Sequence, residues 1–314
     1  MNSGNGILKK QQTTIKRPVK AAGIGLHSGK KVSIRIKPAP AGTGICFIRR
    51  DVDPTMIIPA KAAFVVDTSF ATTIGASHAT IGTIEHLMAA FSGLCIDNAL
   101  VEIDGPEVPA MDGSAAPFMA LLMEAGVRQL RRGRKYLKIV EPVSIADQGK
   151  SITVEPASSF YVSFDIDFEH RVISKQHYEL EVNRRNFIDK IGIARTFGFL
   201  HEVEYMRSRG LALGGSLDNA VVIDEDSVLN SEGLRFSDEF VRHKILDLIG
   251  DLALLGMPLI GKVTAVKSGH AMHHTLCTML LNKPDVWKVV DQDEASGNVE
   301  LRHDVSQRRR VANY

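Results

Sequence analysis

Hydrophobic and polar positions repeat with a helical period over residues 237–256, which read SDEFVRHKILDLIGDLALLG. At about 100° per residue, four apolar positions fall on one stripe and three polar positions fall on the opposite side. The apolar stripe consists of Val241, Ile245, Leu248 and Leu252, and the polar ladder of His243, Asp247 and Asp251. Ser237 is a good N-cap residue and Gly256 a common helix stop. The pattern predicts a helix with one face for the core and one face for chemistry.

Two more helices are predicted in the first third of the chain. One begins at Glu85, is capped by Thr83 and is closed by Gly93. The other covers residues 114–125 and is closed by Gly126.

Alternating hydrophobic and polar positions predict strands between and beyond these helices. Residues 32–36 and 45–49 are expected to be neighbouring strands, and residues 98–103 supply a strand between the two helices. From residue 136 strands again precede a helix, in segments at 136–145, 151–156, 160–168 and 263–266.

This order predicts an α+β fold with two similar domains, each a layered sandwich of sheet and helices, with an active site at their interface. The basic run at 131–135 marks the expected boundary, giving domains 1–133 and 134–314. Residues 199–222 are interpreted as an insertion into the second domain.

Composition narrows the class of protein. A chain of 314 residues with 44% hydrophobic positions is long enough for two ordinary cores. The three cysteines, Cys46, Cys95 and Cys277, form no CxxC pair, which argues against a disulfide framework or a cysteine zinc cluster. Without an apolar leader or a run of ~20 apolar residues, we expect a cytoplasmic protein that does not span a membrane.

The net charge of +2 is only mildly basic. The basic clusters at the N-terminal arm, at 131–135 and at 308–310 are interpreted as solvated ends and a linker. With 6% aromatic residues and none interleaved in these clusters, a nucleic-acid partner is not expected. Attraction to anionic lipid or to a phosphorylated substrate stays open.

Candidate chemistry lies on two of the predicted helices. The spacing of His243 and Asp247 lets both side chains reach one cation, although a solvated helix face is the alternative interpretation. His86 follows Glu85 at a helix N-terminus, where the dipole favours the neutral imidazole that a metal requires. Two histidines and one carboxylate leave a fourth zinc position for water, which is the composition of a hydrolytic zinc site.

Two loop histidines are further candidates. His270 follows a strand and a glycine, Gly269, and is a candidate acid or oxyanion stabiliser. His27 lies in GIGLHSGK, where a turn is favoured over a loop that lines a site.

Seven ordered motifs carry a resemblance over about residues 15–284: GIGLHSGK, TIEHLMAAFSGLCIDN, PAMDGSAAPF, ARTFGF, GLALGGSLDNA, GLRFSDEFVRHKILDLIGDL and KSGHAMHH. The chain resembles the UDP-3-O-acyl-N-acetylglucosamine deacetylase family, zinc amidases of lipid A biosynthesis in Gram-negative bacteria. The segment DTSFATTIGASH and the basic tail match poorly.

The resemblance implies a role for each matching residue. His86, His243 and Asp247 would hold zinc, with Fe²⁺ as a possible replacement in the cell. Glu85 would be the general base and His270 the general acid, and Asp251 would orient His270. Zinc would activate the water that attacks the acetamide, giving acetate and a free 2-amino sugar.

The resemblance also implies the substrate contacts. Thr196 would hold the oxyanion, Phe197 would lie beside the sugar, and Asp167 and Phe168 would hold the nucleotide end. Lys244 and Lys267 would meet phosphate or sugar oxygens. The acyl chain would enter a passage built by residues 199–222 and lined by Phe199, Val203, Ala212 and Gly215.

The implied partner is an acylated UDP-amino sugar, with a monomeric enzyme that associates peripherally with the inner membrane. One alternative is a zinc amidase or esterase for another acylated sugar nucleotide. Another is a non-catalytic protein whose zinc straps two domains together, although such structural sites usually close all four positions with protein ligands.

Overall fold

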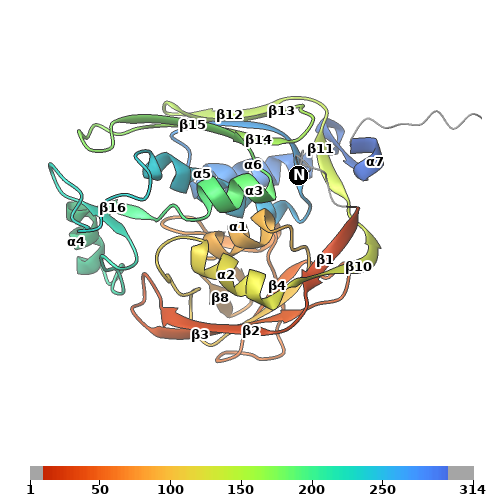
Figure 1. The fold of residues 1–314 in the computed structure, drawn as a ribbon, viewed down its shortest axis with the longest axis horizontal. Helices are drawn as coiled ribbons and strands as arrows, with labels where there is room; N and C mark the ends of the chain where they lie inside the picture. Colours follow the sequence, from red (N-terminus) through yellow and green to blue (C-terminus); the bar gives the residue numbers. More distant parts are fainter. Residues whose placement is uncertain (1–9, 296–314) are drawn as a thin grey trace, which may run out of the picture.

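The computed structural model of the protein describes residues 10–295. Two sheets form the outer layers, and two layers of helices lie between them (Figure 1). The buried hydrophobic residues of both halves form one large continuous cluster. The expected α+β fold class with layered sheets and helices is confirmed.

A five-stranded sheet in the order β2-β3-β9-β4-β5 forms one outer layer. Its strands are β2 (Val19–Ile24), β3 (Lys31–Pro38), β9 (Ala99–Ile103), β4 (Ile45–Arg49) and β5 (Ile58–Pro59). The expectation that residues 32–36 and 45–49 are neighbours is wrong, because β9 pairs antiparallel with β3 on one side and parallel with β4 on the other. A three-stranded sheet of β6 (Val65–Asp67), β7 (Thr73–Ala76) and β8 (Ala79–Ile81) accompanies it.

A seven-stranded sheet forms the other outer layer, in the order β12-β13-β18-β11-β19, with β14 also paired to β18 and β15 to β14. Its strands are β11 (Tyr136–Ile139), β12 (Val143–Asp147), β13 (Lys150–Glu155), β14 (Phe160–Asp167), β15 (Lys175–Glu181), β18 (Leu259–Val266) and β19 (Trp287–Val290). Strand β18 is central because it pairs with β11, β13 and β14. The segments predicted at 151–156 and 160–168 correspond to β13 and β14, whereas the segment 136–145 divides into β11 and β12. Strand β18 begins four residues before the predicted 263–266, and β15 and β19 were not predicted.

A ribbon of β1 (Gln11–Ile15) and β10 (Val127–Gly133) runs beside the helices and leads into β11. The basic run at 131–135 begins within β10 and is not wholly the solvated linker that the sequence suggested. Arg134 is buried and its guanidinium lies 2.7 Å from Asp97, which compensates the buried charge. The basic run at 308–310 lies outside the described residues.

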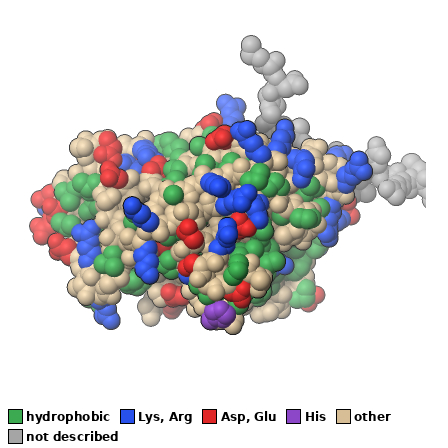
Figure 2. Space-filling model, turned by 90° about the horizontal axis from the view of Figure 1, so that it is seen from below, with side chains coloured by type: hydrophobic (Ala, Val, Ile, Leu, Met, Phe, Trp, Pro, Cys, Tyr) green, Lys and Arg blue, Asp and Glu red, His purple; other side chains and the backbone are tan. Residues whose placement is uncertain are grey.

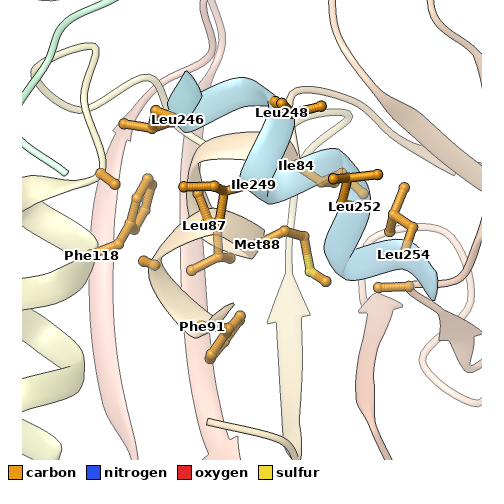
Figure 3. Packing of buried hydrophobic residues seen from close by; sticks show 14 of the residues in the cluster. Ile84, Leu87, Met88, Phe91, Phe118, Leu246, Leu248, Ile249, Leu252 and Leu254 are labelled. Atoms are coloured by element: carbon orange, nitrogen blue, oxygen red, sulfur yellow. The ribbon is translucent and has the colours of Figure 1, made fainter. Parts of the chain in front are cut away.

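Four helices fill the space between the sheets: α1 (Glu85–Gly93), α2 (Ala116–Ala125), α5 (Glu239–Leu252) and α6 (His270–Asn282). Helix α5 packs on α1, with Ile249 beside Leu87 (Figure 3). Both faces of α5 are buried, including the polar ladder, because α1 and the second sheet cover it from opposite sides. Polar side chains on such a helix must find partners within the protein.

The N-termini of three helices differ from the predicted ones. The N-cap position of α5 is Asp238, not Ser237. Helix α1 begins after Ile84, because Thr83 has a positive φ and turns its hydroxyl to Glu107. Helix α2 begins at Ala116, two residues later than expected. Gly256 ends the α5 region as predicted, with φ of 77° in the left-handed region.

Residues 197–223 form a small βαβ unit at one end of the molecule. Strand β16 (Phe197–Phe199) pairs in parallel with β17 (Val221–Ile223), and α4 (Leu200–Ser208) connects them. No residue of α4 is fully buried. The insertion predicted at 199–222 corresponds to this unit.

Short elements complete the described part of the chain: α3 (Arg184–Asn186), a π-helical turn (Phe187–Ile191), α7 (Gln292–Ala295) and 3₁₀ turns at Ala62–Phe64, Ala253–Leu255 and Pro284–Val286. Within residues 10–295, no helix has the length and hydropathy needed to cross a membrane. Viewed from below, the surface mixes Lys and Arg with acidic and hydrophobic side chains (Figure 2).

Candidate active site

Helix α5 carries the polar ladder into the centre of the molecule. His243, Asp247 and Asp251 lie one turn apart on it and are all buried. Gly250 lets α5 approach α1 closely, because a Cβ atom there would lie 2.1 Å from the carbonyl oxygen of Glu85. This contact sets the start of α1, and with it Glu85 and His86, against the ladder.

The three predicted metal ligands converge. The Nε2 atom of His243 lies 3.2 Å from Asp247 Oδ1, and the Nε2 atom of His86 lies 3.5 Å from the same oxygen. The two imidazole rings stand edge to face with centroids 4.9 Å apart. The ligand atoms of these three residues all lie within 4.8 Å of one another.

The donor atoms fit a divalent cation such as zinc. His243 Nδ1 lies 3.1 Å from the carbonyl oxygen of Ala194, and because a carbonyl only accepts, Nδ1 must carry the proton. Nε2 therefore faces Asp247 and is the ring nitrogen that could bind a cation. Two imidazole nitrogens and one carboxylate oxygen are the donors that zinc prefers in an open site, and the carbonyl supplies the second-shell contact that fixes the tautomer.

Lys244 lies beside the triad. Its ammonium group is 2.8 Å from Asp247 Oδ2, the oxygen that does not face the histidines. Burial alone would raise the pKa of Asp247, but the charges of His243 and Lys244 outweigh it and hold that pKa well below its usual range. Asp247 is therefore ionised, as a metal ligand must be.

Glu85 is buried next to the triad, and its Oε2 atom accepts a hydrogen bond of 3.1 Å from the backbone N–H of Thr72. Burial raises the pKa of Glu85 above its usual value, and the nearby charges of Asp251 and Asp247 raise it further against the opposing effect of the histidines. A carboxylate with a raised pKa is suited to general-base chemistry near neutral pH.

His270 begins α6 and donates its Nδ1 proton to Asp251 Oδ2 at 2.7 Å. Burial would lower the pKa of His270, but the charge of Asp251 and this hydrogen bond raise it to about 9. Burial would likewise raise the pKa of Asp251, but His270 and His273 hold it well below its usual range. His270 is therefore a cation at neutral pH and Asp251 its counterion.

Asp251 has two more partners. Its Oδ1 accepts from the hydroxyl of Thr72 at 2.5 Å, and its Oδ2 also accepts from Nδ1 of His273 at 2.8 Å. His273 is fully buried, and burial lowers its pKa, so it is neutral and its Nε2 accepts from the hydroxyl of Ser268 at 2.9 Å. These contacts fix the orientation of the carboxylate that faces His270.

A buried ion pair anchors the segment before β16. The guanidinium Nε of Arg195 lies 2.9 Å from Glu239 Oε1 in the first turn of α5, and its Nη1 lies 2.6 Å from Glu232. Both Arg195 and Glu239 are buried. The pair thereby places the flanking residues Ala194, which binds His243, and Thr196, whose amide donates to Gly113.

An aromatic cluster borders His243. The ring of Phe197 lies 6.3 Å from that of His243 and 5.9 Å from Phe168, and Phe168 lies 5.8 Å from Phe199. Nearby, the ammonium of Lys267 is 2.8 Å from Asp167 Oδ2 at the end of β14. The structure therefore gathers the aromatic candidates, and pairs Lys267 with Asp167.

The remaining predicted site residues lie in the βαβ unit. Val203 is on α4, whereas Ala212, which is buried with a positive φ, and Gly215 are in the loop before β17. Backbone N–H groups of Leu213 and Gly214 donate to the carbonyls of His27 and Leu26, so this loop rests on the GIGLHSGK segment. His27 lies in a turn, as predicted.

Sequence reasoning missed Thr72, His273 and the Arg195–Glu239 pair. Thr72 lies in the segment that matched the resembling family poorly, so that segment was set aside. His273 is three residues beyond His270 in HAMHH and would have been placed on the same face of a helix by its spacing. Glu239 lies in the first turn of α5, where an acidic residue is common because of the helix dipole, so its position gave no signal of an ion pair.

A buried triad of metal donors, flanked by a carboxylate and a cationic imidazole, is the constellation of a metal-dependent hydrolase. The family model of UDP-3-O-acyl N-acetylglycosamine deacetylase matches residues 12–282. The chain belongs to this family of deacetylases, which confirms the resemblance found in its motifs.

Relatives named UDP-3-O-acyl-N-acetylglucosamine deacetylase match nearly the whole chain. The protein of Geobacter sp. (strain M21) is 52% identical over 280 residues, which is 89% of this chain and 92% of the relative. That of Myxococcus xanthus is 51% identical over 279 residues, 89% of each chain. That of Acidithiobacillus ferrooxidans is 49% identical over 286 residues, 90% of this chain and 94% of the relative.

Proposed function

We propose that the protein hydrolyses the N-acetyl group of a UDP-3-O-acyl-N-acetylglucosamine, giving the UDP-3-O-acyl-glucosamine and acetate in lipid A biosynthesis. Family membership and the convergence of His86, His243 and Asp247 beside Glu85 and His270 support this function. We further propose two similar domains, 1–133 and 134–314, with the site at their interface.

His86, His243 and Asp247 would hold one zinc ion. The bound ion supplies a Lewis acid that polarises the acetamide carbonyl and makes water acidic enough to react near neutral pH. Fe²⁺ fits the same nitrogen and oxygen donors.

Glu85 is the proposed general base. Its position beside the triad and its raised pKa allow it to take a proton from the attacking water and to release it later. The hydrogen bond from the Thr72 amide directs Oε2, so the carboxylate is held in one orientation.

His270 is the proposed general acid. Its cationic form, held by Asp251, would stabilise the developing oxyanion and donate a proton to the departing amine. The Nδ1 proton is engaged by Asp251, so Nε2 carries the proton that is transferred. Thr196 would donate a further hydrogen bond to the oxyanion.

The aromatic cluster and its neighbours would bind the rest of the substrate. Phe197 would stack against the sugar, Phe168 and Asp167 would contact the nucleotide end, and Lys267 would meet phosphate oxygens. Lys244 would approach the sugar from its place beside Asp247. The acyl chain would pass along the βαβ unit, past Phe199, Val203, Ala212 and Gly215.

We propose that the enzyme acts in the cytoplasm as a monomer, at the surface of the inner membrane where an acylated substrate or its product would be found.

The test is acetate release from UDP-3-O-acyl-N-acetylglucosamine by protein with one equivalent of zinc, measured beside metal-free protein. Zinc-dependent release is expected. Protein that holds one zinc ion but releases no acetate from this substrate would contradict the proposal.

A further inference from the structure

A large cavity lies away from the proposed metal ligands. It has a volume of about 920 Å³ and is bordered by α1, α3, the end of α5 and the ribbon that leads into β11. None of the residues of the proposed metal triad, and neither Glu85 nor His270, lines it. We call it the α1–α5 cavity.

The interior of the α1–α5 cavity is apolar. Its accessible apolar surface comes from the partly exposed side chains of Ile45, Phe160, Ile188 and Met257. Other apolar residues that border it, such as Phe91 of α1, are packed in the core and almost fully buried. The volume is at the upper end of the range of about 300–1,000 Å³ that is usual for small-molecule sites.

The border of the cavity is basic. Six Lys or Arg residues line it and three Asp or Glu residues do, a net charge of +3. The six cations are Lys61, Arg132, Arg134, Lys135, Arg184 and Arg185. Apart from Arg134, all of them are exposed.

The acidic residues do not balance this charge. Asp97 is held by buried Arg134 at 2.7 Å, and Asp189 lies 3.6 Å from Arg185. Within residues 10–295, no carboxylate forms an ion pair with Lys61, Arg132, Lys135 or Arg184. An apolar interior with a border of uncompensated cations is complementary to a molecule with an alkyl chain and an anionic end.

We propose that the α1–α5 cavity binds a single-chain amphiphile with a terminal anion, with its alkyl chain against Phe160, Ile188 and Met257 and its anion at Arg184 and its basic neighbours. The site is separate from the proposed acyl passage, because residues 199–222 do not line the cavity. It therefore does not rest on the proposed deacetylation.

Cys95 reports on this cavity. It lines the cavity and is partly exposed, whereas Cys46 and Cys277 are buried. Burial also raises the pKa of the Cys46 and Cys277 thiols, which slows their reaction with thiol reagents. Modification of the folded protein should therefore occur first at Cys95, and Cys95→Ser should remove this phase.

The experiment measures the rate of Cys95 modification in zinc-loaded protein with dodecanoate below its micelle concentration. Saturating dodecanoate should slow modification at least about tenfold. Hexanoate lacks the long chain and dodecanol lacks the charge. Each should protect Cys95 at least about tenfold less well than dodecanoate at equal concentration. Dodecyl phosphate distinguishes the kind of anion, since stronger protection by it would indicate a phosphorylated ligand and stronger protection by dodecanoate a fatty acid.

A charge reversal with a matched control tests the site. The double variant Arg184→Glu/Arg185→Glu should weaken protection by dodecanoate at least about tenfold. The control Lys150→Glu/Lys190→Glu makes the same change in net charge at exposed positions that do not line the cavity. Dodecanoate should protect Cys95 in this control as well as it does in the parent. Ala212→Phe, in the proposed acyl passage, should also leave protection unchanged.

The proposal is overturned if dodecanoate does not slow modification of Cys95, or if it protects the Arg184→Glu/Arg185→Glu variant as well as the parent. It is also overturned if dodecanol protects as well as dodecanoate. Deacetylase activity decides none of these outcomes, so the failure of the proposed function would be seen separately.

Discussion

Gly250 of α5 lies directly against the backbone of Glu85 on α1, so that an added Cβ atom would lie 2.1 Å from the Glu85 carbonyl oxygen and 2.8 Å from its carbonyl carbon. Both atoms belong to backbone that cannot turn aside. The two helices are therefore in contact next to candidate catalytic groups on both sides. Gly250 directly precedes Asp251, and Glu85 directly precedes His86.

Gly250→Ala should push α1 from α5, because the clash is with backbone. We expect a loss of stability of about 1–3 kcal/mol and a larger fractional loss of kcat/KM, as Glu85 moves relative to the triad. Urea unfolding and acetate release measure the two effects. Gly133→Ala is the control, since nothing lies within 4 Å of its Cβ position. Parent-like activity and stability in Gly250→Ala would show that the contact has no such role.

His86→Ala and His243→Ala should each lose most of the bound metal, since removing one of three donors leaves two. Metal analysis of the folded variants after dialysis measures this. His177→Ala, whose side chain is largely exposed and pairs with Asp165, is the control and should keep a full equivalent. Retention of a full, tightly bound equivalent by both triad variants would exclude the proposed ligand set.

The pH dependence of kcat/KM should be bell-shaped. Burial raises the pKa of Glu85, which must be deprotonated, so the acid limb should lie above the usual carboxyl value of 4.5. The pKa of His270, which must be protonated, is about 9, so activity should fall as the pH rises through that region.

Two variants test which residue causes each limb of the pH profile. Glu85→Gln should lose on the order of 10² or more in rate while it keeps the metal, and His270→Ala should lose the alkaline limb. Unchanged turnover in Glu85→Gln would place the base elsewhere. An alkaline limb that persists in His270→Ala would remove His270 from the acid role.

Ala212→Phe should selectively slow reaction of the long-acyl substrate, because Ala212 is buried in the loop of the βαβ unit where the passage is proposed. Each buried CH₂ contributes about 0.8 kcal/mol, so a chain of about ten carbons could add several kcal/mol to recognition. Comparison of kcat/KM for acylated and unacylated sugar nucleotides measures the effect. Similar values for both substrates in the parent enzyme, or equal slowing of both by the variant, would argue against the passage.

The predicted helices and strands agree with most of the structure because their signals are local. The helical period of residues 237–256 and the glycine at its end, Gly256, are enough to predict α5. Strand β4 likewise has the predicted bounds Ile45–Arg49. Pairing partners are not local, which is why β9 between β3 and β4 was not foreseen. The cap at Thr83 was mispredicted for the same reason, since Glu107, 24 residues away, takes its hydroxyl.

The three proposed metal ligands could be predicted because each lies on a helix that its local sequence indicates, and the structure brings them together. The groups that orient the candidate site residues could not be predicted from the sequence. Thr72 reaches Asp251 across 179 positions of sequence, and Arg195 reaches Glu239 across 44. Such contacts follow from packing of the layers, and neither spacing nor composition carries a signal for them.

Helix α5 holds the chemistry and is buried on both faces, whereas α4 has no buried residue. Amide hydrogens of α5 should therefore exchange with solvent only when the whole fold opens, while those of α4 exchange through small local fluctuations. Loss of order confined to α4 would leave Glu85, the proposed metal ligands and His270 in place, because these residues lie on α1, α5 and α6. If the proposed acyl passage runs along this unit, substitutions at exposed positions of α4 should change substrate preference with little change in the free energy of unfolding.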